Sequence, residues 1–259
     1  MTRPVVGGLF SYCNTDDDSL VSVILIDDSF SMHGKNDDIE RHTQILSIYN
    51  DILSNISELS EIYITTLSKG KLYSGIKAKL PKIDKIFEIT YTSPDISVSL
   101  AEIKAEYADD YAIKEFYYIT DAGNSHLASA KPFKAYLEEW NIFILIIPPL
   151  EENLSLVDVK INNAILLPNS PLTIKITIKN NGNAYIENKL IQLFINDISV
   201  AQQLVSLKVN SENTYEFITA VPSTGNYACY FKLESDDRVT DNQYYFKITI
   251  PEKLRIGSI

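Results

Sequence analysis

The pattern of the chain changes once, at Pro148 and Pro149, and this change constrains the fold most strongly. Between Leu20 and Pro148, apolar strand-like runs alternate with amphipathic helical patterns, as in "SVILI" followed by "HTQILSIYNDIL". Beyond Pro149, short apolar runs are separated by turn residues and no helical pattern recurs. Alternating strands and helices are typical of an α/β domain, whereas many short strands indicate an antiparallel sandwich. The sequence therefore predicts an α/β domain followed by an all-β domain.

The domain boundaries follow from this change of pattern. We expect an N-terminal extension at 1–19, a doubly wound, Rossmann-like α/β domain at 20–148, a linker at 149–153, an immunoglobulin-like β-sandwich at 154–251 and a C-terminal tail at 252–259. In the first domain, one face of the first helix is predicted to carry Ile39, Ile45, Ile48, Tyr49, Ile52 and Leu53. In the second, "LTIKITIK" alternates almost strictly, which predicts a strand with one wet face.

Charge and hydropathy argue against a nucleic-acid partner and against a membrane-spanning helix. The chain has 23 Lys plus Arg against 34 Asp plus Glu, a net charge of -11, and no basic tract, so nucleic acid is not an expected partner. The longest apolar run, from Trp140 to Leu150, is shorter than the roughly 20 residues of a membrane-spanning helix. The first residues do not resemble a secretory signal, and we expect the sequence to begin at a boundary within a longer protein.

Polar residues crowd the end of the first predicted strand, in "ILIDDSFSM". Asp27, Ser29 and Ser31 are spaced by two, so their side chains can converge as the strand opens into a loop, while Asp28 and Phe30 point elsewhere. Carboxylate and hydroxyl oxygens suit Mg²⁺, a hard cation. Asp and Ser also cap helices, so the same residues are compatible with a purely structural role.

Two enzymatic interpretations find little support. A phosphate-accepting receiver domain would need a later strand-end Asp and a final Lys, but "IYITTLSKG" and "ILIIPP" supply neither. His33 and His126 lie near the predicted site, yet the sequence lacks both the Gly-x-Ser-x-Gly and the His-Glu-x-x-His motifs. We therefore expect a protein that is not an enzyme.

The Asp-x-Ser-x-Ser pattern, with "YYITDAGNS" further on, resembles the metal-ion-dependent adhesion site of von Willebrand factor A domains over residues 20–148. The resemblance implies that Asp121 joins Asp27, Ser29 and Ser31, and that Thr92 is the ligand from the second loop, where Pro94 departs from the family pattern. It also implies Mg²⁺, or alternatively Mn²⁺, and a protein partner that presents an Asp or Glu to the metal. A metal-free scaffold is the alternative interpretation.

The second half, with "KNNGNAY" and "DDRVTDN", resembles the bacterial cell-adhesion-related domain, CARDB. Asp236, Asp237, Asp241 and Asn242 in this half are compatible with calcium ligands and, equally, with turn-forming residues. The order of the two domains resembles Bat-type aerotolerance-regulator membrane proteins. That resemblance implies a bacterial inner-membrane protein, anchored only through segments absent from this chain, with a periplasmic soluble part.

Overall fold

The described residues of the computed structural model form two compact units. The structure describes residues 20–36, 38–81, 89–92, 95–107, 111, 113–122, 131–163 and 165–252. The first unit takes the described residues up to Pro148, except Gly34–Asn36, which fold with the second unit. In the second unit, the Lys35 amide donates to the Asp237 carbonyl at 2.9 Å. No feature of the sequence predicts that this short segment folds with the second unit.

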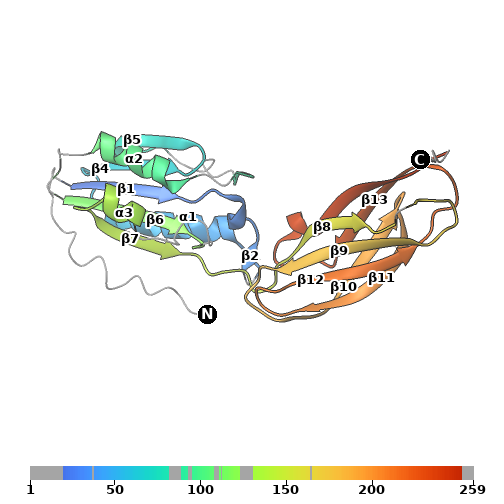
Figure 1. Ribbon diagram of the computed structural model, residues 1–259. Helices are drawn as coiled ribbons and strands as arrows, with labels where there is room; N and C mark the ends of the chain where they lie inside the picture. Colours follow the sequence, from blue (N-terminus) through green and yellow to red (C-terminus); the bar gives the residue numbers. More distant parts are fainter. Residues whose placement is uncertain are drawn as a thin grey trace. The chain divides into compact units, whose positions relative to one another are not determined.

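A five-stranded sheet forms the centre of the first unit (Figure 1). Its order is β5-β4-β1-β6-β7; β1 pairs in parallel with β4 and β6, β7 pairs in parallel with β6, and β5 is antiparallel to β4. Every residue of β1 is buried, as expected for a central strand covered on both faces. The strands of this sheet are β1 (Leu20–Ile26), β4 (Glu61–Thr66), β5 (Gly70–Ile76), β6 (Ile113–Thr120) and β7 (Asn141–Ile146).

Helices pack on both faces of this sheet because successive strand side chains point to opposite faces. Helix α1 (Arg41–Asn55) shares a buried cluster with Ile24 and Ile64, whereas α2 (Ile96–Glu106) shares another with Val23 and Leu25. The remaining short elements are η1 (Phe30–Met32), β3 (Ile39–Glu40), η2 (Lys77–Lys79) and α3 (Lys131–Tyr136) in the first unit, and β2 (Lys35–Asn36) and η3 (Val239–Asp241) in the second.

The structure overturns one expectation for the first unit and leaves another as a prediction. Ile39 was predicted on the buried face of the first helix, which is wrong: it lies in β3, before α1 begins, and is largely exposed. Strands outnumber helices among the described residues, so the chain as a whole is mostly β. Membership of the first unit in the doubly wound class stays a prediction.

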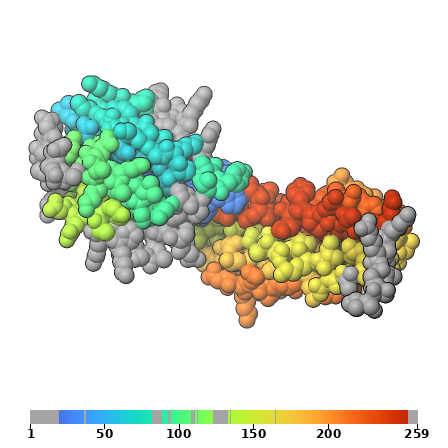
Figure 2. All heavy atoms as spheres, turned by 45° about the horizontal axis from the view of Figure 1, so that its top comes forward, coloured from blue at the N-terminus to red at the C-terminus, as the bar shows by residue number. Residues whose placement is uncertain are grey.

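The second unit is an immunoglobulin-like sandwich of two antiparallel sheets, with orders β11-β10-β13-β14 and β12-β9-β8. Its seven strands agree with the many short strands expected from the sequence. Figure 2 shows β8 and β9, in yellow, beside β14, in red, on one face of this unit. The strands are β8 (Leu154–Ile161), β9 (Leu172–Asn180), β10 (Ile186–Ile195), β11 (Ile198–Leu207), β12 (Glu212–Thr219), β13 (Gly225–Leu233) and β14 (Gln243–Ile250).

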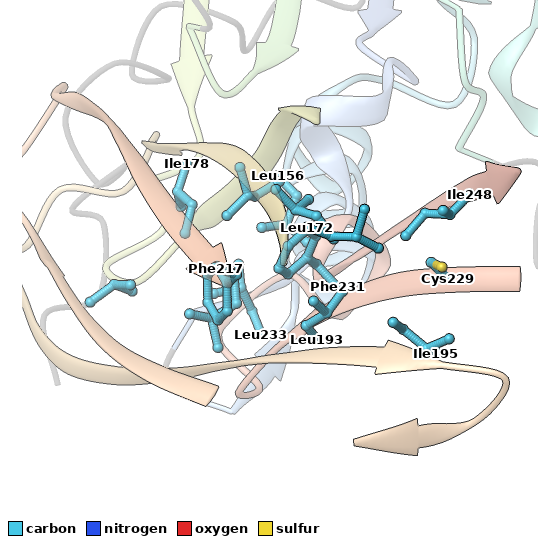
Figure 3. Packing of buried hydrophobic residues seen from close by; sticks show 14 of the residues in the cluster. Leu156, Leu172, Ile178, Leu193, Ile195, Phe217, Cys229, Phe231, Leu233 and Ile248 are labelled. Atoms are coloured by element: carbon cyan, nitrogen blue, oxygen red, sulfur yellow. The ribbon is translucent and has the colours of Figure 1, made fainter. Parts of the chain in front are cut away.

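The core of the sandwich lies between its two sheets (Figure 3). Strand β9 contributes Leu172, Ile174, Ile176 and Ile178, which are fully buried, while the Thr and Lys residues between them face outward. From the other sheet, side chains such as Phe231 meet them, and Phe231 packs edge-on against Phe217 at 5.0 Å between ring centroids. The alternation seen in the sequence is therefore the inside-outside pattern of the sandwich.

Two turns of the second unit depend on the conformations that their Asn, Asp and Gly residues can adopt. Asn196 and Asp197 both have positive φ and join β10 to β11 as a two-residue hairpin, the conformation that Asn and Asp tolerate best after Gly. Asn181 and Gly182 link β9 to β10. These strands belong to different sheets, so the segment connects the two sheets and is not a β-hairpin turn. A Cβ on Gly182 would lie 2.4 Å from the Glu151 carbonyl oxygen, so close packing demands glycine here.

Candidate functional site

The loop that follows β1 carries its polar side chains inside the first unit rather than in solvent. Asp27, Asp28 and Ser29 are all buried, which is unusual for acids unless they are well hydrogen-bonded. The Asp27 amide donates to the Ile119 carbonyl at 2.9 Å, so the loop leaves β1 while still in register with β6. The end of β1 is thereby held against the end of its parallel neighbour.

Asp27 organises this loop through both of its carboxylate oxygens. Oδ1 accepts from the Ser29 amide at 3.0 Å, and Oδ2 accepts from the Thr120 hydroxyl at 2.7 Å. Thr120 is the last residue of β6, so Asp27 joins the ends of the two central strands. This carboxylate is buried behind the site and orients the backbone from which Ser29 projects.

Ser29, Ser31 and Asp121 form a continuous chain of oxygen atoms. The hydroxyls of Ser29 and Ser31 lie 3.0 Å apart, and the Ser31 hydroxyl donates to Asp121 Oδ1 at 3.1 Å. Because β1 and β6 are parallel, their carboxyl ends meet at one edge of the sheet. The structure thus brings together four of the five predicted site residues: Asp27, Ser29, Ser31 and Asp121.

Thr92 does not join this cluster. Its side chain is exposed, and its hydroxyl lies 2.9 Å from that of Thr90. Thr90 is the residue that reaches the loop, because its amide and hydroxyl both donate to the Asp28 carbonyl, at 2.8 and 3.2 Å. Residues 93 and 94 lie outside the described residues, and they include the Pro94 that departs from the family pattern.

Arg41 is the residue of this site that the sequence did not suggest. Its Nη1 atom donates to Asp121 Oδ2 at 3.0 Å and to the Ser31 carbonyl at 2.7 Å, while Nη2 donates to the Pro148 carbonyl at 2.5 Å. The side chains of Arg41 and Asp121 are 1% and 8% exposed, so the ion pair is buried. A cation in the first turn of a helix opposes the helix dipole, and this was the one available sequence signal.

Asp28 faces away from the oxygen cluster. This is expected because it occupies the first x position of the Asp-x-Ser-x-Ser pattern. One of its carboxylate oxygens accepts from the Ser68 amide at 2.9 Å, and the other accepts from the Ser68 hydroxyl. Ser68 lies in the turn between β4 and β5. Asp28 therefore fixes the neighbouring turn and is a structural residue.

Three aromatic rings lie on the loops that carry the site. Phe30 and Tyr91 stack with centroids 5.4 Å apart, and His33 lies 5.4 Å from Phe30 and 5.9 Å from Tyr91. Tyr91 is 80% exposed. Exposed aromatic side chains are common anchors in protein interfaces, and Tyr91 places such a side chain on one of these loops.

The donor set suits a hard cation better than catalysis. Ser29, Ser31 and Asp121 offer only oxygen, and the Ser29 hydroxyl is next to another hydroxyl rather than to a general base. Burial raises the pKa of the Tyr118 hydroxyl far above its ordinary value, and the Asp27 charge adds to the effect, so Tyr118 remains neutral. Among the described residues, no three His, Cys, Asp or Glu side chains group closely enough to form a metal site on their own.

Comparison with known proteins identifies the second unit. Its two antiparallel sheets define it as an immunoglobulin-like domain. The family model named CARDB matches residues 152–244, so this part of the chain is a CARDB domain, as the sequence resemblance implied. The match does not extend to the first unit, where the oxygen cluster lies.

Solved structures with a similar fold also align with part of the chain. One is the CARDB domain of a Pyrococcus furiosus protein in complex with di-metal ions, with 16% identity, 39% of this chain and 94% of that chain covered, and a TM-score of 0.35. Another is a domain of a protein described as a cell surface protein from Methanosarcina acetivorans, with 20% identity, 42% and 100% covered, and a TM-score of 0.35. At these scores the likeness adds nothing to the family match.

Two further findings concern relatives of the chain and its helices. The search of curated proteins gave no match to this chain. None of the helices formed by the described residues has both the length and the apolar character needed to cross a bilayer.

Proposed function

We propose that this chain is a protein-interaction module without enzymatic activity, which binds a partner protein at the corner where β1 and β6 end. The observation that carries the proposal is the chain of oxygens through Ser29, Ser31 and Asp121, held from behind by Asp27. The aromatic rings of Phe30 and Tyr91 add apolar contact area beside it. CARDB domains are generally interaction modules, so the second unit supplies a spacer or a second contact surface.

The family assignment of the first unit is part of this proposal. A sheet with a parallel centre, helices on both faces and a polar cluster at the carboxyl ends of two adjacent strands supports a von Willebrand factor A-like domain. With the CARDB domain after it, this order supports a Bat-type protein of the bacterial envelope. On that proposal, segments outside this chain anchor it in the inner membrane, and the two units face the periplasm.

A bound Mg²⁺, or alternatively Mn²⁺, would be held by the oxygens of Ser29, Ser31 and Asp121. The fit is supported by the closeness of these atoms and by their chemistry, since hydroxyls and a carboxylate are hard ligands. Asp27 would act indirectly, because its oxygens bind the Ser29 amide and the Thr120 hydroxyl and are not part of the chain of oxygens through Ser29, Ser31 and Asp121. An ion with mostly neutral ligands retains affinity for a further anionic oxygen, which an Asp or Glu of the partner protein supplies.

A metal-free scaffold is the second candidate, and Arg41 is the observation that favours it. Its guanidinium already gives Asp121 a positive partner at 3.0 Å inside the first unit. In that case the site residues hold the loops in place, and the partner contacts the surface around Tyr91 without an ion. The two candidates differ in whether Mg²⁺ binds at all.

Calorimetric titration of Mg²⁺ into chelator-treated protein separates them. Binding that disappears in the Ser29→Ala/Ser31→Ala variant and in Asp27→Ala supports the metal site. Thr92→Val is the matched control, because it deletes a hydroxyl that lies outside the cluster and should leave the binding unchanged. The absence of binding at about 10 mM Mg²⁺, far above the range of most protein metal sites, would support the metal-free scaffold.

A further inference from the structure

A second group of polar residues lies in the CARDB domain, around the carboxylate of Asp236. Oδ1 of Asp236 accepts from the Arg238 amide at 3.0 Å and from the Asn242 side-chain amide at 2.9 Å, while Oδ2 accepts from the Leu154 amide at 2.7 Å. Asp236 therefore joins the start of β8 to the segment that precedes β14. Its role is to organise the group.

Three oxygens of this group are buried and lack a hydrogen-bond partner among the described residues. They are Oδ1 of Asn153, Oδ1 of Asp241 and Oδ1 of Asn242. Asn153 and Asn242 are only 2% and 3% exposed. A buried acceptor without a partner costs about 1–3 kcal/mol, so three of them on residues linked to one carboxylate indicate that something else satisfies them.

Each of these three residues is linked to the Asp236 carboxylate by a bond, by an adjacent residue or by charge. Asn242 bonds to it through Nδ2, which also fixes the identity of its free oxygen as Oδ1. Asn153 immediately precedes Leu154, whose amide bonds to the other carboxylate oxygen. Burial raises the pKa of Asp241 to about 6 although the Arg238 charge lowers it, and the charge of Asp236 is close enough to add to the rise.

We propose that Asn153, Asp241 and Asn242 bind a calcium ion beside Asp236. The available donors are all oxygens, from one carboxylate and two amides, and Ca²⁺ accepts such mixed sets with flexible geometry, whereas Mg²⁺ requires a nearly ideal octahedron. The ion would satisfy all three orphan oxygens at once. It would also offset the burial of two carboxylates in one place, which now disfavours the charged form of each.

The cationic side chains nearby do not occupy this position. Arg238 approaches Asp241 at 3.9 Å, but on Oδ2, which leaves Oδ1 without a partner. Lys189 forms its ion pair with Glu152, at 2.6 Å. Because few full negative charges surround the ion, we expect affinity in the range of extracellular modules, with Kd of roughly 10⁻⁴ to 10⁻³ M.

The test uses the full chain, freed of metal with a chelator and titrated with CaCl₂ by calorimetry. The wild type should bind one ion, and Asp241→Asn, which keeps the shape of the side chain, should weaken binding at least tenfold. Asp158→Asn, an equal change of charge on an exposed strand position of the same domain, should leave Kd unchanged within about twofold. Asn153→Asp, which adds a charge at one of the orphan oxygens, should tighten binding several-fold.

The result of the calcium titration is independent of the result of the Mg²⁺ titration at the cluster in the first unit. Asp27→Ala should leave the calcium response intact, since Asp27 lies in the other unit. Thermal unfolding of each variant without calcium confirms that it is folded before its affinity is compared. No calcium binding by the wild type up to about 10 mM, or equal affinity in the wild type and folded Asp241→Asn, would overturn the proposal.

Discussion

Replacing Arg41 by Met should destabilise the first unit more than any other single change of charge at the site. Met keeps much of the length and apolar volume of Arg but removes the cation that faces Asp121. The pair is buried, with side chains 1% and 8% exposed, and removing one partner of such a pair costs about 3–5 kcal/mol because the other charge stays buried. The bonds from Arg41 to the Ser31 and Pro148 carbonyls are lost as well.

Urea unfolding monitored by tryptophan fluorescence measures this cost. Trp140 is the only Trp in the chain, and it packs against a core cluster of the first unit, so its emission reports on that unit. With a slope of about 2 kcal/mol per M urea, a loss of 3–5 kcal/mol lowers the midpoint by about 1.5–2.5 M. The matched control is Lys71→Met, which breaks an exposed ion pair with Glu106 and should cost about 0–1 kcal/mol.

Two results decide the interpretation of Arg41. A loss below about 1 kcal/mol in Arg41→Met would refute the argument that this ion pair holds the site together. If the metal site exists, 10 mM Mg²⁺ should restore more stability to Arg41→Met than to the wild type, because the ion would replace the positive charge that the variant removes from beside Asp121. Equal effects of Mg²⁺ on both would favour the metal-free scaffold.

Three further predictions concern the CARDB domain. Gly182→Ala should cost about 1–3 kcal/mol in thermal or urea unfolding, because its Cβ would overlap the backbone of Glu151; an unchanged midpoint would contradict the close approach. Ile176→Ala, which empties a fully buried site in β9, should cost about 2–5 kcal/mol in the same assay, whereas the exposed Ile218→Ala should cost much less. Burial raises the pKa of the Cys229 thiol to about 11 from 9, so in a Cys13→Ser variant at pH 8 its alkylation should be at least about 100-fold slower than in urea; equal rates would show that the thiol is accessible. The same raised pKa favours the neutral thiol in the folded state, so the stability it contributes is complete below pH 9 and declines as the pH rises toward 11.

The sequence predicted the sandwich well because the pattern that marks it is local. Alternation along β9 depends on neighbouring residues alone, and the structure confirms it. The convergence of Asp27 with Asp121 was also predictable, although 93 residues separate Asp27 from its partner Thr120. Once two strands are assigned as parallel neighbours, their carboxyl ends must meet.

The rest of the site depends on contacts that no local pattern encodes. Arg41 looks like an ordinary surface residue of a helix, and only its packing against Asp121 makes it part of the cluster. Thr90 rather than Thr92 reaches the loop, a difference of two positions within an irregular segment where periodicity gives no guide. The orphan oxygens of Asn153 and Asn242 likewise became visible only when their surroundings were known.

The placement of Gly34–Asn36 affects how fragments of this protein should be designed. These three residues lie between Ser31 and Arg41 in the chain, yet they belong to the second unit, where the Lys35 amide donates to the Asp237 carbonyl. Gly34 has φ +119°, and a Cβ there would lie 2.8 Å from the Asp237 carbonyl oxygen, so the segment is fitted to that location. A fragment cut at Pro148 would separate residues 34–36 from the rest of the unit to which they belong, so metal affinity at the nearby Ser29 and Ser31 should be measured on the longer chain.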